Sequence, residues 1–236
     1  MKRKSMKSMK TRSVIAFITS IVVLTAFQSV LSGMVVANYS ECAFGETCSG
    51  STGLSSGMGE ETQSAVAIQW LVVQGAGHFL KADSEILLFL NKIEMSQFNG
   101  IDYSDIQPHL TSAISEMEAA RDNYLDLKAL SDSAPYNHTF VNHLKKFDYD
   151  KHQQLKKLST ETIQEVKSYL GEGDVKGFYA AFLKKTEAIL ERLYYIKQSI
   201  DSKTLPVISD IWRLNQMCTE TLLFGQDAAE IFYSVR

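Results

Sequence analysis

Five histidines and three cysteines are the side chains of this 236-residue chain that could bind a metal or a cofactor. His138, His143 and His152 lie near each other in the sequence with Asp148 and Asp150, and such clusters can bind zinc or another transition metal. Their spacing matches no metal-binding pattern, and the segment has the composition of a solvent-exposed connection. We therefore predict that the chain binds no metal. In the alternative that it does, His138, His143 and His152 are the candidate ligands.

His78 is the histidine that falls inside a strongly predicted helix. Small residues at positions 75–77 would leave room beside it for a flat ring such as haem. The chain lacks the Cys-x-x-Cys-His string of covalent haem, and no histidine follows a glutamate by three residues as in di-iron bundles. We interpret His78 as a histidine at the edge of the helix-packing core and predict no cofactor. A haem or metal carrier, with its site between helices near His78, is the alternative function.

Cys42 and Cys48 bracket a short glycine-containing loop, and in an oxidising compartment this spacing predicts a disulfide. A metal site or a redox pair there is disfavoured, because no histidine or third cysteine lies nearby. Cys218 falls in the apolar stripe of the last predicted helix, which predicts a buried free thiol. The competing interpretation is a bond from Cys218 to Cys42 or Cys48.

Motifs of catalysis are missing from the sequence. It contains no Gly-x-Ser-x-Gly, no phosphate-binding glycine-rich loop followed by Lys-Ser or Lys-Thr, and no His-Glu-x-x-His. Catalytic triads can assemble from distant positions, so the absence of these motifs is weak evidence against an enzyme. We predict a protein without enzymatic activity.

The N-terminal residues 1–37 have the features of an export signal. Six of the 24 basic residues lie in the first twelve positions, an apolar run covers residues 14–27, and small residues precede a cleavage site after Ala37. The alternative is an uncleaved membrane anchor, because residues 13–37 are long enough to span a bilayer. Either interpretation places the rest of the chain outside the cytoplasm, in the periplasm or in the medium.

Charge argues against nucleic acid as a partner. Without residues 1–37 the chain carries 18 basic and 27 acidic side chains, a net charge of −9 against −3 for the whole chain. An acidic surface repels phosphate backbones and anionic lipid headgroups. We expect membrane contact only if the N-terminal segment is retained as an anchor.

The rest of the chain divides by composition into a tether and a domain. Residues 38–59 are rich in glycine and serine, which predicts a flexible tether carrying the disulfide loop. Residues 60–236 show helical periodicity and no alternating pattern of a strand, so we predict an all-α, up-and-down antiparallel bundle of four to five long helices. The helices are expected at about 60–97, from Asp105 to 131, 148–170, 175–200, and from a cap at Ser202 or Thr204 to the C-terminus.

The first predicted helix carries two apolar stripes. One is an unbroken heptad seam, typical of helices that interlock as in coiled coils: Ala65, Ile68, Val72, Gly75, Phe79, Ala82, Ile86, Phe89 and Ile93. The second stripe is turned away from this seam and is either buried among neighbouring helices or a surface for a protein partner or a homo-oligomer. Its residues are Val66, Val73, Leu80 and Leu87, which lie seven apart, together with Trp70 and Leu88. The predicted function is accordingly that of an exported, non-enzymatic binding or scaffold protein.

Overall fold

A computed structural model describes residues 60–100, 102–133, 138–156 and 160–235. The predicted signal or anchor (1–37), the tether (38–59) and the Cys42–Cys48 disulfide lie outside the described residues. Within these ranges the chain forms seven helices and no strand, so the all-α prediction is confirmed.

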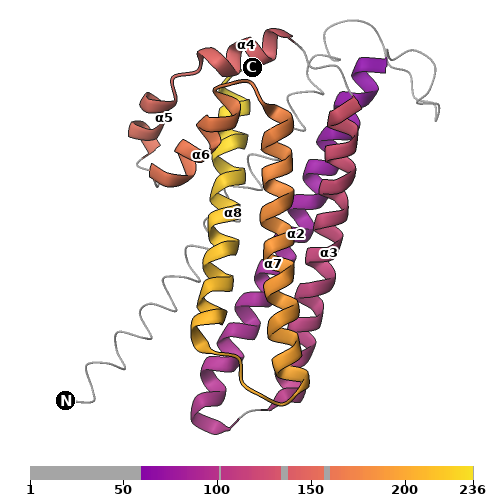
Figure 1. Ribbon diagram of the computed structural model, residues 1–236, viewed down its shortest axis with the longest axis vertical. Coiled ribbons are helices and arrows are strands. Elements are labelled where there is room, and N and C mark those ends of the chain that lie inside the picture. The colour runs from indigo at the N-terminus through magenta and orange to yellow at the C-terminus, as the bar shows by residue number, and fades with distance from the viewer. Residues whose placement is uncertain (1–59, 101, 134–137, 157–159, 236) are drawn as a thin grey trace, which may run out of the picture.

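Four of the helices are long and three are short (Figure 1). The long ones are α2 (Glu60–Asn99), α3 (Tyr103–Ser133), α7 (Val175–Asp201) and α8 (Ile208–Ser234). The short ones, α4 (His138–Lys146), α5 (Tyr149–Lys156) and α6 (Thr160–Leu170), gather beside one end of α8. The predicted single helix over 148–170 is wrong, because α5 ends at Lys156 and α6 begins at Thr160. Its start is close to the prediction: α5 begins at Tyr149, where the Asp148 carboxylate accepts a hydrogen bond from the Lys151 backbone N–H at 3.0 Å.

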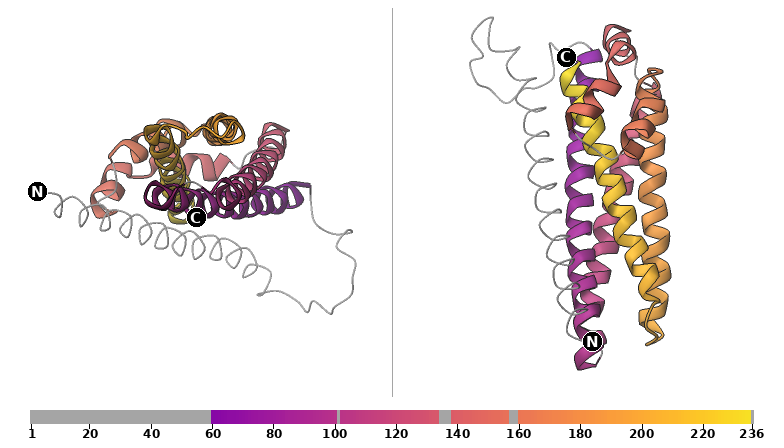
Figure 2. Two further views of the ribbon diagram at one scale, coloured as in Figure 1. Left: turned by 90° about the horizontal axis from the view of Figure 1, so that it is seen from below. Right: turned by 90° about the vertical axis from the view of Figure 1, so that its left-hand side faces the viewer.

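Polar pairs at two levels each show that α3 runs antiparallel to α2 and to α7. Between α2 and α3, His78 pairs with Glu116 and Glu85 with His109. Between α3 and α7, the Lys176 ammonium donates to the Asp132 backbone carbonyl, and Gln107, near the other end of α3, donates to Asp201. An ion pair between Arg192 and Asp210 joins α7 to α8. Figure 2 shows the four long helices side by side from two further directions.

Two of the predicted helix starts need correction. The α3 helix begins at Tyr103, and its first turn is capped by Asp102, whose carboxylate accepts from the Ser104 backbone N–H at 2.9 Å. Asp105, the predicted cap, lies inside this turn, and its Oδ2 is 2.7 Å from Nζ of Lys92. The α8 helix begins after Val207 rather than at Ser202 or Thr204, with no side-chain cap.

The start of α7 follows the sequence prediction. The Asp174 carboxylate accepts a hydrogen bond from the Gly177 backbone N–H at 2.8 Å, which confirms Asp174 as the cap. Gly173, with φ of 77°, supplies the turn between α6 and α7. This tight connection keeps α6 beside the first turns of α7.

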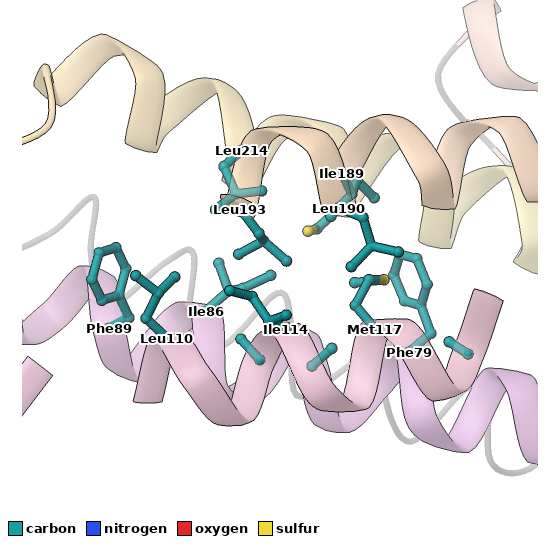
Figure 3. Close-up of a cluster of buried hydrophobic side chains, with 14 of the residues drawn as sticks. Phe79, Ile86, Phe89, Leu110, Ile114, Met117, Ile189, Leu190, Leu193 and Leu214 are labelled. Atoms are coloured by element: carbon teal, nitrogen blue, oxygen red, sulfur yellow. The ribbon is translucent and has the colours of Figure 1, made fainter. Parts of the chain in front are cut away.

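The main hydrophobic core lies between the four long helices (Figure 3). From Gly75 onward the predicted heptad seam of α2 is confirmed as the inner face of that helix, because Phe79, Ala82, Ile86, Phe89 and Ile93 are at most 3% exposed. The side chains that complete this core come from the other long helices: Leu110, Ile114, Met117, Ile189, Leu190, Leu193 and Leu214. A second, smaller core joins α4, α5 and α6 to the adjoining ends of α7 and α8.

Two glycines of α2 have opposite surroundings. A Cβ on Gly75 would lie 2.4 Å from Cε1 of Tyr124, whose ring packs against the helix backbone and edge-on to Phe182. A Cβ on Gly77 would have no atom within 4 Å. Packing within the chain thus requires a glycine at position 75, whereas nothing in the chain packs against Gly77, which lowers the helix propensity.

Replacing each glycine by alanine tests this difference. We expect Gly77→Ala to raise the free energy of unfolding by about 0.5–1 kcal/mol, because alanine loses less backbone entropy. Gly75→Ala should lower it by about 1–3 kcal/mol, because the Tyr124 ring must move. Urea unfolding of both variants makes the measurement, and equal effects of the two substitutions would contradict the packing of Tyr124.

Candidate functional site

A carboxylic acid and a thiol meet inside the main core. Asp83 of α2 is 3% exposed, and its side chain is hydrogen-bonded to that of Cys218 of α8, which is fully buried. Cys218 is free, as the sequence predicted. Asp83 was missed, although its position four residues after Phe79 and three before Ile86 places it on the inner side of the helix.

Burial controls the protonation of both groups. Loss of hydration raises the pKa of Asp83 to about 7, a shift that the hydrogen bond from Cys218 partly offsets. Burial, together with the nearby Asp83 carboxyl, raises the pKa of the Cys218 thiol. A thiol that stays protonated and shielded from water is a poor nucleophile. The pair is therefore suited to packing and to a pH-dependent stability rather than to catalysis.

The buried Asp83 predicts a fold that loses stability as the pH rises. The folded chain binds the Asp83 proton up to about pH 7, whereas the unfolded chain releases it near 3.8. The contribution of the bound Asp83 proton to the free energy of unfolding is complete below pH 3.8 and is lost as the pH rises through 7. The total loss in the free energy of unfolding is on the order of 4 kcal/mol. Urea unfolding from pH 4 to pH 8.5 should show this loss in the wild type relative to Asp83→Asn. Parallel pH profiles of the two proteins would contradict it.

Two histidine–glutamate pairs lie along the edge of the α2–α3 interface. Nδ1 of His78 is 2.7 Å from Oε2 of Glu116, and Nδ1 of His109 is 2.7 Å from Oε2 of Glu85. All four side chains are between 26% and 29% exposed. His78 thus lies at the edge of the core, and a metal or haem bound there through Nδ1 would have to displace Glu116. The pair formed by His109 was missed, because its register requires knowing how α2 and α3 align.

The other candidate ligands have partners of different kinds. Nδ1 of His143 lies 2.9 Å from the backbone carbonyl of Val235, and Nε2 of His152 lies 3.7 Å from Oε2 of Glu230. The side chain of His138 lies outside the described residues. Across the described part of the chain, three or more His, Cys, Asp or Glu side chains nowhere gather in a way that could hold a metal ion.

The predicted partner stripe on α2 divides between core and surface. Leu80 is buried in the main core, Val73 packs against it, and Leu87 is partly buried. Trp70 is 58% exposed, and the side chain of Val66 lies outside the described residues. Leu80 is therefore a packing residue, and most of this stripe does not form an open surface.

The open face of α2 is a line of residues that shares only Trp70 and Leu88 with the predicted stripe, and we call it the outer seam. Its members follow each other at alternating steps of four and three: Trp70, Gln74, Gly77, Lys81, Ser84, Leu88, Asn91 and Met95. Three of them are large, apolar and exposed, namely Trp70 (58%), Leu88 (42%) and Met95 (56%). Lys81 carries the single charge of the seam. A long helical face with this little charge is typical of a protein-binding surface.

A second exposed apolar group lies where α7 turns into α8. Leu205, Val207, Ile208 and Trp212 are each more than 40% exposed. Ile208 is exposed although its neighbours further along α8 are buried, because α8 begins only at that residue. Its first turn extends past the main core, so that Ile211 is the first buried position of α8.

Comparison with known proteins identifies no relative of this chain. No family model, no curated protein and no solved structure matches the chain. Among the helices that the structure describes, none combines the length and the apolar character needed to cross a membrane.

Proposed function

We propose that this chain is an exported, non-enzymatic binding or scaffold protein that acts outside the cytoplasm. In this proposal the four long helices form an up-and-down bundle, and the outer seam of α2 binds a protein. Export is supported by the basic and apolar pattern of residues 1–37. The absence of the common catalytic motifs from the sequence supports a role in binding.

The observation that carries the proposal is the outer seam itself. A helix of a soluble bundle buries one apolar face and normally covers the other with charged side chains. The outer seam of α2 instead exposes Trp70, Leu88 and Met95 with Lys81 as its one charged member. Tryptophan and methionine are enriched at protein interfaces, where lysine is depleted. Binding of a protein therefore explains the composition of this face better than solvation does.

Photo-cross-linking in the producing cells tests the proposal. A benzophenone amino acid at position 88 should yield a covalent protein adduct, because Leu88 would lie in the interface. The same amino acid at Leu125 of α3 is the matched control, since Leu125 is 43% exposed but lies away from the outer seam. No adduct at position 88, or equal adducts at both positions, would overturn the proposal.

Two glutamate substitutions control for folding. Leu88→Glu should keep the far-ultraviolet circular dichroism and the unfolding midpoint of the wild type while losing the bound protein, because Leu88 is 42% exposed. Leu80→Glu should unfold the protein, because Leu80 is 7% exposed and a buried unpaired carboxylate costs several kcal/mol. Unfolding of Leu88→Glu would show that this face belongs to the core.

A further inference from the structure

We propose that the protein bound by the outer seam is a second copy of this chain, with the two α2 helices packed antiparallel. The inference rests on the proposed function of the outer seam and names its partner. A homodimer with two-fold symmetry is the commonest assembly of soluble proteins, and it requires a surface that is complementary to itself. The outer seam meets this requirement through its spacing, the sizes of its residues and the charge of Lys81.

Spacing allows the seam to pair with itself. The steps of four and three read the same from either end of the seam, so an antiparallel copy aligns its residues in register. The register that pairs the whole seam places its first member opposite its last. The resulting pairs are Trp70 with Met95, Gln74 with Asn91, Gly77 with Leu88, and Lys81 with Ser84.

The sizes of the paired residues fit this register. Leu88 projects into solvent from one chain, and Gly77 of the other offers open space, since a Cβ built there has no atom within 4 Å. Met95 would bring its thioether to the indole of Trp70, a favourable sulfur–aromatic contact. Gln74 and Asn91 would bring two side-chain amides together, each able to donate and accept. Each large apolar residue therefore has a partner that can accommodate it.

Charge selects the antiparallel orientation. The Lys81 side chain is 65% exposed, with its ammonium 4.0 Å from Glu116 of its own chain. In the antiparallel register Lys81 lies opposite Ser84 and beside Glu85 of the second copy, where opposite charges attract. A parallel pairing would instead place Lys81 against Lys81 and Trp70 against Trp70.

The seam from Trp70 to Met95 is about 38 Å long at 1.5 Å per residue. A contact of one helix pair lies at the small end of protein interfaces, so the dimer should exchange with monomer.

Disulfide trapping tests the register. Gln74→Cys and Asn91→Cys are introduced separately into the exported protein carrying Cys42→Ser and Cys48→Ser, so that the buried Cys218 is the only other thiol. Under mild oxidation, a mixture of the two variants should form a covalent dimer, and each variant alone should form little. Dimers from each variant alone would indicate a parallel arrangement, and no dimer in any sample would overturn the inference.

Sedimentation of Gly77→Glu provides the second test. This variant should fold, because the position is open and Lys81 lies one turn away, but its carboxylate would meet Leu88 of the second copy. We expect the dissociation constant of the dimer to rise about tenfold or more, while Gln198→Glu on the exposed face of α7 leaves it unchanged. A wild type that sediments as a monomer at all concentrations, or no effect of Gly77→Glu, would contradict the inference.

The mass of the adduct formed at position 88 separates the two proposals. An adduct of twice the chain mass supports both the outer seam as a binding face and the second copy as its partner. An adduct of another mass leaves the outer seam as a binding face and overturns the second copy. No adduct overturns both.

Discussion

The packing of the heptad seam of α2 from Gly75 to Ile93, the inner seam of this helix, is the constraint on which the rest of the structure depends. Phe79, Ile86 and Phe89 fill the space between α2 and the other three long helices, and this fixes the rotation of α2 about its axis. Once that rotation is fixed, the position of every other residue of the helix follows. Asp83 must lie inside the core, His78 and Glu85 at its edge, and Trp70, Leu88 and Met95 in solvent.

The polar side chains of α2 illustrate how burial assigns a role. Asp83 and Cys218 are of types that can act in catalysis, yet their buried surroundings raise the pKa of both and so favour the neutral form of each. Removing such a carboxylic acid from water costs free energy that the hydrogen bond to Cys218 only partly offsets. The two histidine–glutamate pairs are half-buried instead, and they bridge α2 and α3 in one common register.

The sequence predicted those features that repeat along one helix. The inner seam and the Asp174 cap depend on local spacing, and both are confirmed by the structure. Features that depend on the neighbours of a helix were not predictable in the same way. Leu80 belongs to an apolar stripe whose burial is decided by what packs against α2, and the His109–Glu85 pair requires the alignment of two helices. The division of residues 138–170 into three short helices depends on a second core that joins distant segments.

Hydroxyl-radical footprinting of the dilute protein tests most directly the central claim that α2 buries one seam and exposes the other. The account predicts rapid oxidation of Trp70 and Met95 and protection of Phe79 and Phe89 on the same helix, because only the inner seam is in the core. As the protein is concentrated, Trp70 and Met95 should become protected by the second copy that we propose binds there. Protection of Trp70 and Met95 already in the dilute monomer, or oxidation of Phe79 and Phe89, would contradict the account.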